Sequence, residues 1–257
     1  MDEDGNYKLP ENEVVAIKTE LVGLMIRVPP AIQSQLGEAI SVIADSDFWE
    51  RWDTLVDVGR HIPKLHVLPD MLFLQDLVSR LTPDNAAVNN GVLQVAHSIF
   101  RRWRPLFRSD QLFTEINHVL SKFSRPFLTL LQNTDAAIDA NQSNTQALRQ
   151  HVSNLSLCFQ LFYDLSCQDL PPDFEDNLSS LCSLLDKYIK YDNGALYTDD
   201  EGEVGPLETV KAEIFEVLTL YVSKFRNRRK RPTAGSLSPL GGNFEILELT
   251  HPTGPEV

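Results

Sequence analysis

The sequence is poor in cysteine. Its 257 residues include three, Cys158, Cys167 and Cys182, and these form neither a C-x-x-C pair nor a spacing typical of zinc ligands. A disulfide-stapled scaffold and a zinc module are therefore excluded. The three thiols are predicted to be buried and reduced, as in a protein of the cytosol or nucleus.

Long apolar runs are also missing. No stretch has the roughly 20 consecutive apolar residues that a membrane-spanning helix needs, so we expect no membrane insertion. The N-terminus, MDEDGN, is acidic and polar, unlike a secretory signal peptide. No convincing run alternates apolar and polar residues, which is the pattern of a half-buried strand. These absences point to an all-α protein outside the membrane.

No motif of a known catalytic class is present. The sequence has no G-x-G-x-x-G, no P-loop, no H-E-x-x-H and no G-x-S-x-G. His97, His118 and His151 fall in predicted helices without a metal-ligating neighbour three or four residues further on, so core or surface positions are the better interpretation. The many carboxylates form no pair that stands out from a solvated face. We therefore expect no enzyme, no cofactor and no metal site.

Positive charge is in short supply. The chain has 36 acidic against 23 basic residues, for a formal net charge of -13. Such an excess repels nucleic-acid phosphates and anionic lipid and favours basic protein partners, although it also serves plain solubility. We expect no nucleic-acid partner.

Amphipathic helices dominate the sequence pattern. Apolar residues recur at spacings of three and four, which places them on one face of a helix. The stripes lie within 14–24, 32–43, 48–55, 88–103, 112–123, 127–138, 148–165, 178–188 and 207–225. Trp103 and Phe159 are predicted to be buried between helices. Ser124 to Pro126 is predicted to start a new helix, and Asp139 to Gln146 to be a loop.

These helices form pairs of about 40 residues, which is typical of HEAT units. The short breaks between them predict antiparallel neighbours, in either an open solenoid or a closed bundle. No repeat is visible letter by letter. We predict a right-handed α-solenoid of HEAT-type, armadillo-like helix pairs.

Two segments break this pattern. Residues 58–75 contain Gly59, Pro63 and Pro69, and their removal would let Trp52 and Leu55 continue in phase into Leu77. We interpret 58–75 as an insertion into a helix, and its ends allow the hypothesis of a retained intron; transcript reads that join Asp57 to Asp76 would support it. Residues 226–257 are basic, then rich in proline, glycine and serine, and are predicted to be a disordered tail.

Three charged clusters are candidate docking sites. Arg101, Arg102, Arg104 and Arg108 surround Trp103 where a predicted helix ends; they either complement the helix dipole or bind an acidic partner surface. Asp199, Asp200, Glu201 and Glu203 precede a predicted helix at Pro206; they either favour its N-terminus or bind a basic partner. Arg226, Arg228, Arg229, Lys230 and Arg231 resemble a nuclear localisation signal or belong to a flexible tail.

Several of these segments resemble one protein family. They are 30–40, 47–52, 89–103, 112–116, 162–177 and 196–201, and they include NNGVLQVAHSIFRRW and FYDLSCQDLPPDFEDN. They are similar to the importin-α re-exporter, the CAS-type exportin of the importin-β (karyopherin) superfamily. The resemblance covers residues 11–57 and 76–225.

The resemblance implies a superhelix of HEAT repeats without catalytic residues. Members of the family bind Ran-GTP and importin-α together in the nucleus and return importin-α to the cytoplasm, shuttling through the nuclear pore as monomeric receptors. By this comparison, residues 1–57 continue a missing N-terminal region, 76–225 belong to the central helices, and the large C-terminal part is absent. Segments 58–75 and 226–257 match nothing in the family. We therefore expect a partial transport receptor; the alternative is another helical-repeat scaffold without Ran dependence, such as a different transport receptor, a coat or a phosphatase scaffold.

Overall fold

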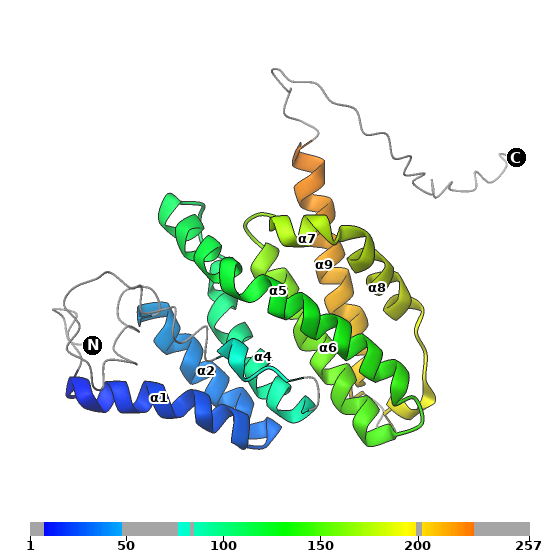
Figure 1. Ribbon diagram of the computed structural model, residues 1–257, viewed down its shortest axis with the longest axis horizontal. Coiled ribbons are helices and arrows are strands. Elements are labelled where there is room, and N and C mark those ends of the chain that lie inside the picture. The colour runs from blue at the N-terminus through cyan, green and yellow to red at the C-terminus, as the bar shows by residue number, and fades with distance from the viewer. Residues whose placement is uncertain (1–7, 48–76, 83–84, 199–201, 229–257) are drawn as a thin grey trace, which may run out of the picture.

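The chain folds into antiparallel helix pairs stacked side by side, as the computed structural model shows (Figure 1). The structure describes residues 8–47, 77–82, 85–198 and 202–228, and no strand occurs among them. The all-α prediction is confirmed for this part of the chain. The helices are α1 (Glu11–Arg27), α2 (Pro30–Asp47), α4 (Ala86–Phe100), α5 (Asp110–Ala140), α6 (Thr145–Ser166), α7 (Pro172–Asp176), α8 (Leu178–Lys190) and α9 (Pro206–Arg228), with the short 3-10 turns η2 (Arg101–Trp103) and η3 (Gly194–Leu196).

Side-chain caps fix where several helices begin. Asn85 accepts a hydrogen bond from the backbone N–H of Val88, Ser109 from that of Leu112, and Asn144 from that of Ala147. Each cap satisfies one of the N–H groups that the first turn of a helix leaves unpaired, which stabilises a helix by about 1 kcal/mol.

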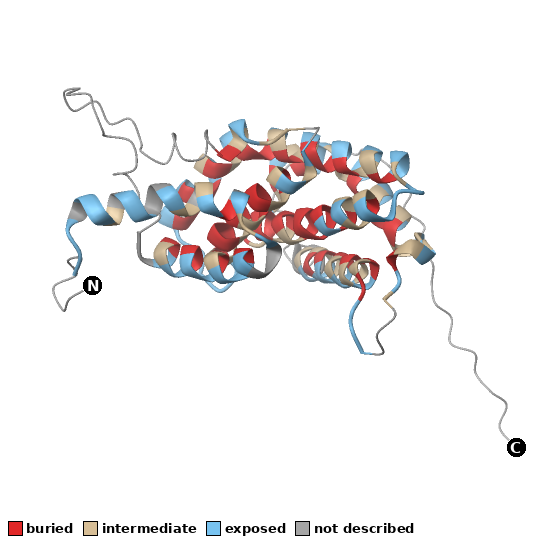
Figure 2. Cartoon of the chain, turned by 90° about the horizontal axis from the view of Figure 1, so that it is seen from below, coloured by how far each residue is buried: buried red, intermediate tan, exposed pale blue. Residues whose placement is uncertain are grey.

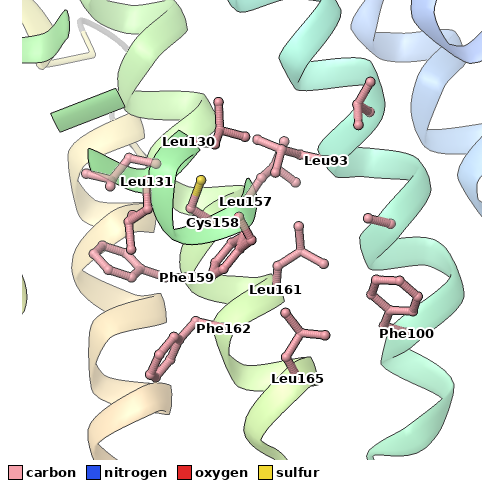
Figure 3. Close-up of a cluster of buried hydrophobic side chains, with 14 of the residues drawn as sticks. Leu93, Phe100, Leu130, Leu131, Leu157, Cys158, Phe159, Leu161, Phe162 and Leu165 are labelled. Carbon is pink, nitrogen blue, oxygen red and sulfur yellow. The ribbon is translucent and has the colours of Figure 1, made fainter. Parts of the chain in front are cut away.

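Helix α6 is the centre of the stack. It packs against α4 on one side and α9 on the other, with α5 also in contact. Leu161 and Leu165 lie on the side that faces Phe100 of α4, whereas Phe162 points toward α9 (Figure 3). The phenyl ring of Phe162 stacks on Tyr221 with 5.9 Å between ring centroids. The broad apolar arc of this segment thus serves two neighbours.

Burial follows the predicted helix periodicity from α4 onward, whereas Ile17, Leu24 and Ile32 of the first two predicted stripes are 45%, 43% and 44% exposed. Buried residues lie on the faces that the helices turn toward one another, and exposed residues lie outside (Figure 2). Trp103 is 0% exposed and Phe159 is 2% exposed, so both core predictions are confirmed. A tight contact joins α2 to α4, because a side chain at Gly37 would place its Cβ 2.8 Å from Ser98 Oγ.

The predicted helix start at Ser124 to Pro126 is wrong. Helix α5 runs unbroken from Asp110 to Ala140 with Pro126 inside it. A proline there removes one backbone hydrogen bond and costs about 3 kcal/mol. The buried stripe continues in phase across it through Phe123 and Phe127, so packing on both sides outweighs the cost. The predicted loop is shorter than expected, because α5 reaches Ala140 and α6 starts at Thr145.

The cysteine prediction holds only in part. Cys158 is buried, Cys167 is partly buried and Cys182 is exposed, and all three are free thiols. Cys182 lies on the outer face of α8, between the buried Leu181 and Leu185 in the sequence. The prediction rested on how often free cysteines are buried, and it did not weigh the predicted stripe through Leu181, Leu185 and Tyr188, of which Cys182 is not a member.

Segments 48–76 and 229–257 lie outside the described residues. The interpretation of 58–75 as an insertion therefore stays a prediction. The predicted tail begins too early, because α9 continues to Arg228; a difference of this size is common at helix ends. No described helix is both long enough and apolar enough to cross a membrane.

Candidate docking surface at the arginine-rich turn

The turn between α4 and α5 is built around Trp103. Its indole ring is fully buried and stacks on Phe100, with 4.8 Å between centroids and 9° between ring planes. The indole Nε1 donates a 2.6 Å hydrogen bond to Oε1 of Glu115, a buried carboxylate on α5. Arg102 donates to the same oxygen. A buried carboxylate needs such donors, so Trp103 and Arg102 hold Glu115 while it orients them.

Arg101 connects the turn to the preceding helix pair. Its Nη2 lies 2.6 Å from Glu38 Oε2 and its Nε 3.2 Å from Ser41 Oγ, both on α2. The Glu38 side chain is 67% exposed, so solvent screens this ion pair and it contributes at most about 1 kcal/mol.

Arg104 connects the turn to the following helix pair. Its Nε donates a 2.5 Å hydrogen bond to Oδ1 of Asp164 on α6, and its guanidinium lies over the ring of Tyr163 at 4.2 Å. The Asp164 side chain is fully buried, and its Oδ2 lies 2.7 Å from Nδ1 of His97. His97 is thus a partly buried residue that pairs with a carboxylate, within the range of roles expected from the sequence.

Arg108 closes the turn through a carbonyl group. Its Nη2 donates to the backbone oxygen of Gln168, just beyond α6. The side-chain Nε2 of Gln168 donates in return to the carbonyls of Trp103, at 2.7 Å, and Leu106, at 2.9 Å. Gln168 therefore fixes the turn at both ends, through the carbonyls of Trp103 and Leu106 and through the side chain of Arg108.

The structure thus gives all four arginines intramolecular partners, and three of these partners are carboxylates. Arg101 faces Glu38 of the preceding helix pair and Arg104 faces Asp164 of the following one, whereas Arg102 faces Glu115 within the same pair. Sequence reasoning weighed only the helix dipole and an external partner. It missed this third role because Glu38 and Asp164 are about 60 residues away in sequence. Binding of an acidic partner by these arginines stays a prediction.

The acidic loop is only partly described. Asp199, Asp200 and Glu201 lie outside the described residues, so their predicted role in partner binding is untested. Glu203 is exposed, and its backbone oxygen accepts a 3.1 Å hydrogen bond from Thr198. Glu208 lies in the first turn of α9, where an acidic residue is favourable.

Two grooves cross the surface between helices. One, of about 360 Å³, lies between residues 78–82 and the middle of α5 and is lined by Val78, Leu81, Pro126 and Leu130 among others. The other, of about 160 Å³, lies between α5 and α8. Among the described residues, no group of three or more histidine, cysteine, aspartate or glutamate side chains is placed to hold a metal ion.

The comparisons with known proteins agree with one another. A family model described as Cse1 matches residues 99–231. Over 228 residues the chain is 46% identical to the importin alpha re-exporter of Saccharomyces cerevisiae. This alignment covers 88% of this chain and 22% of that protein. Over 229 residues it is 38% identical to Exportin-2 of Homo sapiens, in an alignment that covers 89% of this chain and 22% of that protein.

A solved structure is similar as well. It is the exportin Cse1 in its cargo-free, cytoplasmic state, with a TM-score of 0.78 and 45% identity over 88% of this chain and 23% of that chain. The predicted helical solenoid is thereby confirmed, and the match decides against the other helical-repeat families that the sequence left open. The chain spans less than a quarter of the length of these relatives. It belongs to the Cse1 family.

Proposed function

We propose that the chain is a segment of a nuclear transport receptor that contributes to binding importin-α together with Ran-GTP. The supporting observation is the 46% identity, over 88% of the chain, to a protein named importin alpha re-exporter. In this function the receptor returns importin-α to the cytoplasm, so it shuttles between nucleus and cytoplasm. Its work is recognition through helix faces and turns, without catalysis.

The stacked helix pairs support this function physically. A solenoid presents a long series of turns and helix faces to a partner, and each pair packs mainly on its neighbours. The ion pairs Arg101–Glu38 and Arg104–Asp164 join successive helix pairs, and the buried pair Arg102–Glu115 fixes the turn between α4 and α5. Such rigidity lowers the entropy lost on binding.

One segment of a superhelix is expected to bind weakly. Affinity in a long receptor depends on simultaneous contacts by widely separated repeats, which raise one another's effective concentration. We therefore expect micromolar binding to importin-α that weakens as ionic strength rises, because much of the attraction comes from the net charge of -13.

The test is a titration of the full chain against purified importin-α, with and without Ran-GTP, at low and at physiological salt. Serum albumin in place of importin-α is the control for non-specific association. Absence of measurable binding to importin-α at low salt would contradict the proposed function. Nanomolar binding that strengthens with Ran-GTP would instead make this chain a complete transport unit rather than a contributing segment.

A further inference from the structure

Helix α9 has an exposed apolar stripe on the side that faces away from the stack. Its buried face lies against α6, where Tyr221 stacks on Phe162. The opposite face carries exposed residues at helical steps of three, four and three, namely Ala212, Phe215, Thr219 and Val222. The side chains of Phe215 and Val222 are 59% and 66% exposed. On a chain with a net charge of -13, an uncharged stripe of this kind indicates a contact surface.

Helix α2 has a matching stripe on its own outer side. Its buried face approaches α4 closely at Gly37 and Ser98. The opposite face carries exposed residues at the same steps, namely Ile32, Gln35, Ala39 and Val42. None of these residues is charged, and Val42 is 62% exposed. The two stripes thus lie at opposite ends of the row formed by α2, α4, α6 and α9 (Figure 1).

The helices of this row run in the same direction. Between neighbours, earlier residues of one helix contact earlier residues of the next, and later residues contact later ones. These contacts are Asn90–Asn154 and Arg104–Asp164 between α4 and α6, Gln160–Glu213 and Phe162–Tyr221 between α6 and α9, and Gly37–Ser98 and Arg101–Ser41 between α2 and α4. A helix that continued the row beyond α9 in the same way would therefore be parallel to α9, as α2 of a second copy would be.

The charges of α9 and α2 match in this arrangement. The last five residues of α9, KFRNR, include three basic residues, whereas α2 has Asp45 and Asp47 in its last turn and no lysine or arginine. Parallel packing brings these two ends together. The acidic residues of α9 lie in its first half and would meet the first half of α2, which is uncharged. Opposite charges therefore meet at one end, and no like charges meet at the other.

Junctions within the chain already have this form. Where α4 ends, Arg101 pairs with Glu38 of α2 and Arg104 pairs with Asp164 of α6. Parallel helices of the row are thus joined by apolar faces along their length and by arginine–carboxylate pairs toward their ends. A junction between α9 of one copy and α2 of another would repeat this pattern.

We propose that copies of this chain associate end to end, with the outer stripe of α9 in one copy packed on the outer stripe of α2 in the next. One chain cannot join its own two stripes, because they lie at opposite ends of the row. The contact joins two different surfaces, so it can repeat from copy to copy. This inference is independent of the proposed function, since it needs no importin-α.

The association is expected to be weak. A junction between helix faces is smaller than the roughly 1,200–2,000 Å² that stable complexes bury, which corresponds here to a dissociation constant on the order of 10–100 µM. Sedimentation velocity of the full chain between about 2 and 200 µM therefore covers the transition. Physiological ionic strength limits the repulsion between two chains of net charge -13, because the Debye length is then about 8 Å.

Serine substitutions test the two stripes separately. Phe215→Ser on α9 and the double variant Ile32→Ser/Val42→Ser on α2 should each weaken self-association roughly fivefold or more. Phe107→Ser is the matched control, because it removes a phenylalanine that is 95% exposed in the turn before α5, outside the row. It should stay within about twofold of the unchanged chain. Phe215→Leu keeps an apolar side chain and should retain most of the association, which separates loss of contact from loss of folding.

A mixture of the two defective variants gives the sharpest result. The α2 variant keeps an intact α9 stripe, and Phe215→Ser keeps an intact α2 stripe, so the two together can form one good junction. The mixture should therefore yield a 1:1 dimer that does not grow further, at concentrations where each variant alone is a monomer.

Three results would overturn the proposal. The first is a monomer at every concentration, which means that the stripes stay uncovered or that other segments of the same chain cover them. The second is self-association that Phe215→Ser and Ile32→Ser/Val42→Ser weaken no more than Phe107→Ser does. The third is a mixture of the two variants that forms no dimer.

Discussion

Arg104 Nε lies 2.5 Å from Oδ1 of Asp164, and this bond joins the turn after α4 to the buried C-terminal half of α6. The other carboxylate oxygen of Asp164 is 2.7 Å from Nδ1 of His97. The fully buried carboxylate of Asp164 on α6 therefore bonds both to His97 on α4 and to Arg104 in the turn, and it fixes α6 relative to them. Its two oxygens have charged or polar partners, as a buried carboxylate requires.

The first prediction concerns this carboxylate. Asp164→Asn should lower the free energy of unfolding by about 2–3 kcal/mol, because Arg104 loses its charged partner while the side-chain volume is kept. The value lies below that for a wholly buried pair, since Arg104 is 34% exposed and partly solvated. Urea denaturation followed by circular dichroism measures the change.

The matched control is Asp186→Asn. Asp186 pairs with Lys190 on the surface of α8, with both side chains more than half exposed. Its substitution should change stability by less than about 0.5 kcal/mol. Equal losses for Asp164→Asn and Asp186→Asn would contradict a structural role for the buried pair.

A second prediction concerns Trp103. Trp103→Ala should cost about 3–5 kcal/mol, because it empties a fully buried site and removes the donor that Nε1 offers to Glu115. Trp103→Phe should cost less, since the stacking on Phe100 is kept. Phe215→Ala, on the exposed face of α9, serves as the control. An effect of Trp103→Ala below about 1 kcal/mol would be inconsistent with the observed burial.

How far the sequence predicted the fold depends on the kind of feature. The stripe from Val88 to Trp103 placed α4 and its buried face correctly, because packing enforces a period of 3.6 on a helix with a buried face. The break expected at Pro126 was wrong, because local propensity was outweighed by Phe123 and Phe127 in the core. The five-residue α7 was not predicted, since a single turn carries too little periodicity to detect.

The candidate site was less predictable than the fold. The sequence indicated four arginines around Trp103, but it gave no sign that Arg104 reaches Asp164 or that Arg101 reaches Glu38. Such pairs depend on how one helix pair is placed against the next. The sequence also did not indicate that Phe107 is 95% exposed; the available signal was an apolar Leu106–Phe107 pair that follows a proline and lies outside both stripes.

A third prediction concerns alkaline pH. Burial raises the pKa of the Cys158 thiol from its ordinary value of 9.0 to about 12, and that of Cys167 to about 11. Between pH 9 and about pH 11 the unfolded chain has released both thiol protons, whereas the folded chain still holds them. Stability is therefore unaffected by these thiols below about pH 9 and falls as the pH rises above it, by up to about 1.4 kcal/mol per pH unit for each group.

Cys158→Val tests this dependence. The variant should lose stability less steeply between pH 9 and 11 than the unchanged chain, as measured by urea midpoints at each pH. Cys182→Ser, which removes an exposed thiol, should change the slope less. If the slope of Cys158→Val matched that of the unchanged chain, burial of this thiol would not explain the alkaline loss.

A fourth prediction concerns the predicted tail. Because α9 continues to Arg228, removal of residues 229–257 should leave the helical signal per molecule and the melting temperature unchanged. Limited proteolysis with trypsin should cut first in the basic cluster at 228–231. A loss of helix signal on deletion, or a protease-resistant segment beyond Arg228, would contradict the sequence-based expectation of disorder.

The last prediction concerns residues 58–75. Their deletion joins Asp57 to Asp76, so that Trp52, Leu55, Leu77 and Leu81 follow one another at helical steps of three, four and four. The junction lies outside the described residues; just after it, residues 77–79 are helical and Leu77 is fully buried, as a helix continuing from Asp57 would require. One continuous helix would remove the entropy cost of bringing together the two ends of an 18-residue insertion. Its apolar face would also pack beside α5, along the groove of about 360 Å³.

We therefore expect the chain that lacks 58–75 to melt at a higher temperature than the full chain, by roughly 2–4 °C for each kcal/mol gained. Deletion of 240–257, which removes the same number of residues from the predicted tail, is the matched control and should leave the melting temperature unchanged. A lower melting temperature on deletion of 58–75 would mean that this segment packs as part of the fold. The helical phase across Asp57 and Asp76 would then be coincidental, because a segment that stabilises its host helix is not an interruption of it.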